Sequence, residues 1–178
     1  MIKKFTLIIL FNIISIAVVF AETNKLHPYP FYMNKLISIA KANPKAPFAA
    51  MIVDKNTGEV LSVGLNKVHS ENNPTLHGEI VAINNCSKEH PNINWNNTVL
   101  LTTAEPCPMC ESAIVWAGIP IVVYGTSIDY LKSQGWNQID IDSNSVIKNA
   151  SFYHGKVIGG VLSKKTDLLF ERKIKNIT

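Results

Sequence analysis

Two short stretches decide how this chain folds: His-Gly-Glu at residues 77–79 and Pro-Cys-Pro-Met-Cys at residues 106–110. Each stands at the start of a predicted helix, one over residues 75–86 and one over residues 108–117, because apolar residues follow at helical spacing and proline is tolerated in a first helical turn. A buried strand is predicted between them. If the two helices lie side by side on one face of a sheet, their starts meet.

The remaining pattern predicts an α/β order. A helix and a β-hairpin come first, strands then alternate with helices, and a basic amphipathic helix closes the chain. Such an order indicates a mixed sheet with helices on both faces. The stretch 135–149 shows no pattern that we assign. The predicted elements are helices 31–41, 75–86, 108–117, 127–134 and 164–173, and strands 47–53, 59–65, 98–102, 119–124 and 156–161.

Three side chains at the two helix starts have the chemistry of zinc ligands: His77, Cys107 and Cys110. The C-x-x-C pair alone fits either a redox disulfide or a metal site. The positive end of a helix favours thiolate, and one imidazole with two thiolates suits Zn²⁺. Three protein ligands leave a coordination position for water, which is typical of a catalytic site. Glu79, two residues after the histidine, is placed to relay protons.

These segments resemble the zinc-dependent cytidine/deoxycytidylate deaminase superfamily, nearest to its guanine deaminase and tRNA adenosine deaminase branches. The likeness is carried by residues 73–79 and 105–117. It implies a cytidine deaminase-like fold, a three-layer α/β/α sandwich with about five strands, usually as a homodimer. It assigns zinc to His77, Cys107 and Cys110, and the proton shuttle to Glu79.

The resemblance also implies a substrate pocket for a nucleobase or nucleoside. Four residues are expected to contact the substrate: Asn66, Phe48, Gly78 and Trp116. The expected function is zinc-dependent hydrolytic deamination by an activated water, with guanine favoured. A tRNA adenosine deaminase acting on RNA, or a non-catalytic zinc or thiol protein, is the alternative. One departure from the superfamily is Gly78, where alanine is usual.

Composition and the N-terminus complete the expectation. The 178 residues are 47% hydrophobic and 17% charged with a net charge of +4, which suits one globular domain over residues 22–178. Two lysines, an apolar run and small residues predict a signal peptide over residues 1–21, with an uncleaved anchor as the rival. We therefore expect an exported protein, periplasmic or secreted, with no membrane contact in its mature form.

Overall fold

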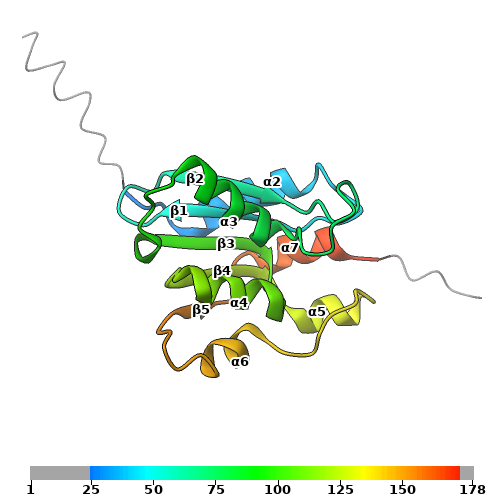
Figure 1. The fold of residues 1–178 in the computed structure, drawn as a ribbon. Coiled ribbons are helices and arrows are strands. Elements are labelled where there is room, and N and C mark those ends of the chain that lie inside the picture. The colour runs from blue at the N-terminus through cyan, green and yellow to red at the C-terminus, as the bar shows by residue number, and fades with distance from the viewer. Residues whose placement is uncertain (1–24, 173–178) are drawn as a thin grey trace, which may run out of the picture.

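A mixed five-stranded sheet forms the centre of the computed structural model, which describes residues 25–172 (Figure 1). The predicted signal peptide lies outside the described residues. The strand order is β2-β1-β3-β4-β5. Strand β1 pairs antiparallel with β2 and β3, while β4 pairs parallel with β3 and β5. The strands are β1 Ala49–Asp54, β2 Val60–Leu65, β3 Thr98–Ala104, β4 Ile121–Thr126 and β5 Lys156–Ile158.

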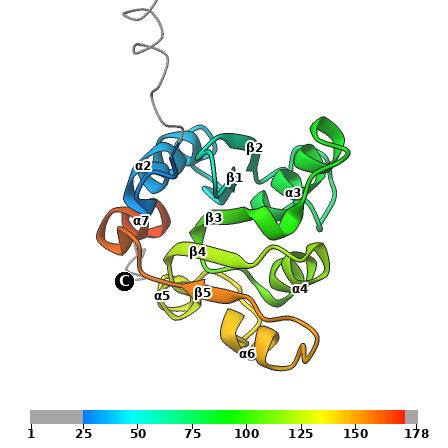
Figure 2. The ribbon, with the colours of Figure 1, turned by 90° about the vertical axis from the view of Figure 1, so that its left-hand side faces the viewer.

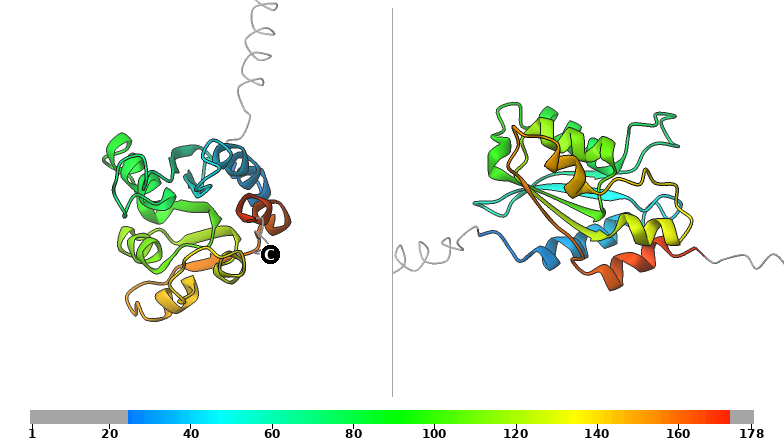
Figure 3. Two further views of the ribbon diagram at one scale, coloured as in Figure 1. Left: turned by 90° about the vertical axis from the view of Figure 1, so that its right-hand side faces the viewer. Right: turned by 90° about the horizontal axis from the view of Figure 1, so that it is seen from below.

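Helices cover both faces of this sheet, as Figures 2 and 3 show. Helices α2 (Tyr29–Ala40) and α7 (Ser163–Phe170) lie on one face, and α3 (Gly78–Glu89) and α4 (Pro108–Ala117) lie on the other. The predicted three-layer α/β/α sandwich is therefore confirmed. Two shorter helices, α5 (Ile128–Ser133) and α6 (Ser143–Lys148), and the 3₁₀ turn η1 (Trp95–Asn97) complete the described elements.

The central strands are buried on both sides, and their side chains alternate between two cores. Met51 and Val53 of β1 pack with α2, whereas Ala50 and Ile52 pack with α3 and α4. This alternation follows from the period of two in a strand. It explains why β1 and β3 read as continuous apolar runs, which are typical of strands covered by helices on both faces.

Two local features differ from the prediction. Helix α3 begins at Gly78, three residues later than predicted, because Asn73 turns the chain by accepting a hydrogen bond from the Thr75 amide at 3.0 Å. Helix α6 lies within residues 135–149, where the sequence pattern predicts no element. Its N-cap is Asp142, whose carboxylate accepts from the Ser145 amide at 2.6 Å.

Close backbone approach explains two glycines beside the site. A Cβ on Gly64 of β2 would lie 2.1 Å from the Gly78 carbonyl oxygen, and a Cβ on Gly78 would lie 2.8 Å from the Phe48 carbonyl oxygen. The start of α3 is therefore pressed onto β1 and β2 at a distance that a larger side chain would increase. Separately, none of the helices within residues 25–172 is long and apolar enough to cross a membrane.

Candidate metal centre and active site

Two helix starts meet above the carboxyl end of β3. His77 is the N-cap residue of α3, Cys107 is the N-cap residue of α4, and Cys110 lies in the first turn of α4. Pro108 occupies the first position of α4, where its missing N–H costs no helical hydrogen bond. Both N-caps have extended backbone and no side-chain capping bond, so the imidazole and the thiol are free to point toward each other.

The three predicted ligand residues come together. Their ligand atoms all lie within 4.8 Å of one another, and Cys107 Sγ is 3.6 Å from His77 Nδ1. A tetrahedral zinc ion, with bonds of about 2.3 Å to sulfur and about 2.0 Å to nitrogen, holds such atoms roughly 3.5–3.8 Å apart. The spacing and the donor set, two thiols and one imidazole, therefore fit zinc.

The pKa values of the two thiols favour one thiolate at this site. Hydrogen bonding from Cys110, helped by His77, lowers the pKa of the Cys107 thiol to about 4. The hydrogen bond that Cys110 makes with Cys107, together with burial, raises the pKa of the Cys110 thiol well above its ordinary value. The hydrogen bond with Cys107 raises the pKa of His77. The pair thus holds a thiolate at neutral pH, the form in which cysteine binds metals.

Glu79 adjoins this group through Cys110 and is 4% exposed. Its Oε1 accepts a hydrogen bond from the Thr102 hydroxyl of β3 at 2.9 Å. Burial raises the pKa of the Glu79 carboxyl, and the neighbouring Cys107 raises it further. A carboxyl that is fixed by one hydrogen bond and holds its proton more firmly than usual is suited to general acid–base work.

The structure brings together three of the four predicted substrate residues. The Asn66 backbone N–H donates to the Phe48 carbonyl at 2.9 Å, and Gly78 packs against that same carbonyl. The Phe48 ring lies in an aromatic cluster with Trp136 and Phe170, whose ring centroids are 5.2 and 4.9 Å away.

The structure does not bring Trp116 to this group. It lies on the outward face of α4, 78% exposed, with its ring 5.0 Å from that of Phe152. The inward positions of α4 are taken instead by Cys110, Glu111 and Ile114, all fully buried.

Sequence reasoning missed two carboxylates that support the site. Glu105 accepts from the Ile128 amide at 3.0 Å and from the Ser143 amide at 3.1 Å, so it joins the loop before Cys107 to the starts of α5 and α6. Glu111 is buried, and neither of its carboxylate oxygens has a hydrogen-bond partner within the described residues. Only their proximity in sequence to the C-x-x-C pair could have drawn attention to them.

Comparison with known sequences identifies a family over this region. A family model described as the cytidine and deoxycytidylate deaminase zinc-binding region matches residues 29–126. A tRNA-specific adenosine deaminase from Rickettsia bellii is 26% identical over 143 residues, which cover 80% of this chain and 95% of the relative. A guanine deaminase from Bacillus subtilis is 40% identical over 78 residues, or 44% of this chain and 49% of the relative.

Solved structures share the fold. A guanine deaminase from Nitrosomonas europaea superposes with a TM-score of 0.71 at 22% identity, covering 82% of this chain and 84% of its own. A structure from a study of tRNA:A34 deaminases superposes with a TM-score of 0.65 at 21% identity, covering 78% and 99%. At these identities the likeness establishes the fold alone.

The relatives contradict the predicted localisation. The name of the first gives tRNA, a molecule of the cell interior, as its substrate, whereas the N-terminus led us to predict an exported, periplasmic or secreted protein. That prediction is wrong and is not carried further. It depended on charge and apolar composition in residues 1–21, which lie outside the described residues, and such composition is shared by several kinds of segment.

Proposed function

This chain belongs to the cytidine and deoxycytidylate deaminase zinc-binding family, and on that premise we propose that it removes an amino group hydrolytically from a purine ring, with guanine as the first candidate. One observation carries the proposal. An imidazole nitrogen and two cysteine sulfurs lie within 4.8 Å of one another, and the buried Glu79 carboxyl adjoins one of them, the Cys110 sulfur. A metal centre with an adjacent proton-transfer group is the minimum that hydrolytic deamination needs.

Zinc is the cofactor of this family, and the proposed ligands are His77, Cys107 and Cys110. Bound there, zinc supplies a water nucleophile at neutral pH by lowering its pKa. Glu79 accepts the proton from the attacking water at its carboxylate and delivers it to the departing amine. Thr102 fixes the carboxylate for both transfers through its hydroxyl. The raised pKa of Glu79 supports this double role, because a carboxyl with an ordinary pKa returns a proton less readily.

The proposed pocket uses Asn66 to hydrogen-bond the base edge and Phe48 to pack against its ring. The backbone at Gly78 completes the floor. Support for a purine comes from neighbours of the same fold: two of the solved structures hold 8-azaguanine and 2,6-diaminopurine. The exposed position of Trp116 gives it no part in the pocket of a single chain.

A second candidate is the deamination of adenosine in tRNA. The observation in its favour is the share of each relative's length over which the sequences align. The tRNA-specific adenosine deaminases of two Rickettsia species match 95% and 96% of their own length, whereas the match to guanine deaminase covers 49%. Residues beyond the central motifs therefore resemble the RNA-acting relatives as well.

The test is ammonia release by zinc-loaded protein from a panel of guanine, adenine, cytosine, their nucleosides and a tRNA anticodon stem-loop. Glu79→Gln removes the titrating group at nearly the same size, and zinc content measured on both proteins shows whether the metal centre survives. We expect turnover of at least one purine substrate and its loss in Glu79→Gln with zinc retained. Bound zinc without ammonia from any substrate would instead support a non-catalytic zinc protein.

The predicted homodimer remains a prediction. The exposed Trp116 and Phe152 rings support it, since paired aromatic side chains left in water commonly mark protein interfaces. Sedimentation velocity on the protein and on Trp116→Ser tests it. A monomeric wild-type protein would remove the proposal.

A further inference from the structure

Helices α2 and α7 present a basic face on the side of the sheet opposite the metal centre (Figure 2). None of its lysines enters an ion pair within residues 25–172. The two helices and the residues that directly follow them contain only two carboxyls, Asp167 and Glu171, and Asp167 is bonded to β4. We define the basic face by its four exposed lysines: Lys35, Lys41, Lys164 and Lys165.

A hydrogen bond between the two helices joins this face into one surface. Lys165 Nζ donates to Asn34 Oδ1 at 3.1 Å, and both residues lie on the outward sides of their helices. Lys35 directly follows Asn34, and Leu168 lies three residues after Lys165, so both are within about one helical turn of this bond. The positive charges of the two helices therefore act together on whatever approaches this side.

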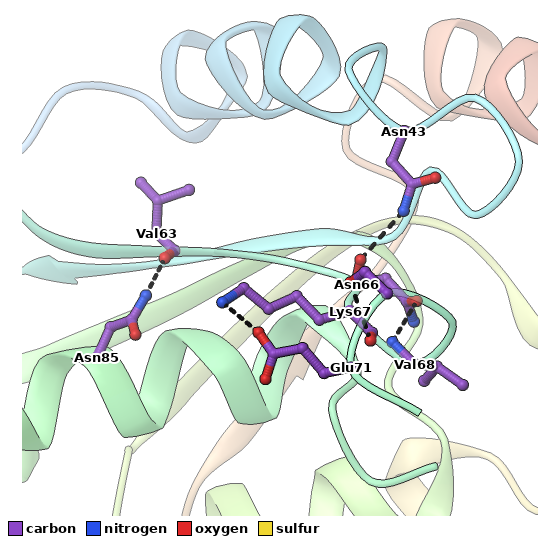
Figure 4. A network of polar contacts seen from close by, with 8 residues as sticks. Asn43, Val63, Asn66, Lys67, Val68, Glu71 and Asn85 are labelled. Atoms are coloured by element: carbon purple, nitrogen blue, oxygen red, sulfur yellow. Dashed lines mark hydrogen bonds and ion pairs between the residues drawn. The ribbon is translucent and has the colours of Figure 1, made fainter. Parts of the chain in front are cut away.

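Groups other than these lysines fix both helices to the rest of the molecule. The side-chain amide of Asn43, which follows α2, donates to the Asn66 carbonyl at 3.0 Å (Figure 4). The Thr126 hydroxyl of β4 donates to the Asp167 carboxylate of α7 at 2.8 Å. Figure 4 also shows α2 and α3 on opposite sides of the sheet. A partner can therefore bind the lysine side chains without disturbing these contacts or covering the metal centre.

Two large apolar side chains are exposed among the lysines. Phe31 is 41% exposed and Leu168 is 64% exposed. Lys35 Nζ lies 4.4 Å from the centroid of the Phe31 ring, and Leu168 lies four residues after Lys164, so each has a lysine beside it. Exposed apolar side chains flanked by lysines are typical of helices that lie on an anionic membrane surface, because the apolar groups enter the acyl boundary while the ammonium groups contact the headgroups.

The sequence before α2 also favours a bilayer. Residues 5–20 are apolar except for Thr6, Asn12 and Ser15, and residues 21–28 join this run to the start of α2. Transfer of such a composition from water into hydrocarbon is favourable. A bilayer that took up this run would lie next to α2 and its basic face.

We propose that the basic face docks on an anionic lipid surface, with Phe31 and Leu168 entering the interface and the metal centre facing away from it. A polynucleotide also attracts positive charge, but an aliphatic side chain offers a base no stacking surface, and the four cations are lysines without the planar fork of arginine. We expected no membrane contact from the sequence once residues 1–21 are removed, whereas this face belongs to the described residues. The inference does not depend on the proposed function.

The first experiment is co-sedimentation of the full chain with vesicles of phosphatidylcholine alone and of an equimolar phosphatidylcholine–phosphatidylglycerol mixture. Lys35→Gln/Lys164→Gln is compared with Lys88→Gln/Lys148→Gln, which removes the same charge from exposed positions of α3 and α6. We expect wild type to prefer the mixed vesicles and the face variant to bind them about thirtyfold more weakly, since each lysine at an anionic surface contributes roughly a factor of five. The control variant should bind as wild type does.

Circular dichroism and zinc content that match wild type show that a loss of binding is not a loss of folding. Equal binding of wild type to both kinds of vesicle would overturn the proposal, because it assigns no part to charge. The same conclusion follows if the face variant and wild type bind the mixed vesicles equally, or if wild type binds neither.

The second experiment reports which side of the molecule meets the bilayer. Leu168→Trp places a fluorophore on the basic face, whereas the native Trp116 is 78% exposed on α4, in the opposite layer. With mixed vesicles that contain brominated lipid, we expect quenching in Leu168→Trp well above that of wild type. Equal quenching of the two proteins would place another side on the bilayer and refute the proposed orientation.

A parallel titration with single-stranded RNA of mixed sequence separates the two kinds of polyanion. RNA binding that weakens in Lys35→Gln/Lys164→Gln, without binding to mixed vesicles, would assign the face to a polynucleotide and overturn the membrane proposal. None of these measurements requires turnover. Failure of the proposed deaminase function would therefore leave the membrane test intact, and failure of vesicle binding would leave the deaminase proposal untouched.

Discussion

Glu111→Gln is predicted to stabilise the protein increasingly as the pH rises. Glu111 lies on the buried side of α4, and neither of its carboxylate oxygens has a hydrogen-bond partner within the described residues. The Ser143 hydroxyl of α6, which acts to lower the pKa of Glu111, donates its hydrogen bond to the Pro106 carbonyl at 3.2 Å. Burial, together with smaller contributions from the carboxylates of Glu79 and Glu105, raises the pKa of Glu111 to about 8.

The direction and magnitude of this stability change follow from the difference between the pKa of Glu111 in the folded and the unfolded chain. Below the ordinary pKa of 4.5 both folded and unfolded chains hold the proton, so burial of Glu111 carries no ionisation cost. Between 4.5 and about 8 only the unfolded chain releases it, and the free energy of unfolding falls by about 1.4 kcal/mol per pH unit. Above the folded-state pKa the cost is constant at roughly 4–5 kcal/mol. Glutamine has no such titration.

The assay is urea unfolding of wild type and Glu111→Gln at several pH values between about 6 and 8, with saturating zinc so that metal linkage is common to both. The difference between them should grow by roughly 2–3 kcal/mol over that range in favour of the variant. Glu59→Gln, which changes an exposed carboxyl, should show a constant difference. Parallel pH profiles for wild type and Glu111→Gln would refute the argument that burial holds a proton on this residue.

Three further changes probe the support of the site. Thr102→Val removes the hydrogen bond that stabilises the charged form of Glu79. The acid limb of the plot of kcat/KM against pH should therefore move up by about one to two pH units, because a hydrogen bond to a charged group is lost. Thr98→Val, at the other end of β3, should leave the acid limb in place. Glu105→Gln weakens two charge-assisted bonds to helix starts and should cost about 1–3 kcal/mol of unfolding free energy, seen as faster amide exchange at the first turns of α5 and α6. Gly78→Ala forces a methyl group against a backbone carbonyl, and thermal unfolding should report a loss of about 1–3 kcal/mol.

The metal ligands could be predicted because their geometry is local. His77, Cys107 and Cys110 each stand within one turn of a helix start, and the intervening strand and helices were readable from their apolar pattern. The only non-local assumption was that the two helices lie on one face of the sheet. The parallel pairing of β3 and β4 and the antiparallel pairing of β1 and β3 produce that arrangement.

The supporting residues could not be predicted because they depend on non-local packing. Thr102 reaches Glu79 across 23 positions of sequence, and Glu105 reaches Ser143 across 38. Nothing in a run of threonines on a strand distinguishes the one that faces a carboxylate. The same holds for the outward orientation of Trp116, which differs from its buried neighbour Val115 by a single step along the helix.

The first turn of α4 combines two opposite requirements, and this affects how the site is stabilised. At its start, two thiols and an imidazole need a fixed separation to share one ion, and Glu105 ties the preceding loop to two other helix starts. One residue after Cys110, Glu111 places a buried carboxyl without a hydrogen-bond partner in the described part of the chain, where an apolar residue would pack without that penalty. The buried Glu111 carboxyl therefore lowers stability directly beside Cys107 and Cys110, the residues whose positions must be most precise. The destabilisation caused by Glu111 is tolerated only because the surrounding contacts hold α4 in place. Glu105 makes two of these contacts, to the starts of α5 and α6. Weakening Glu105 should therefore increase local opening of α5 and α6 before it increases opening of the sheet.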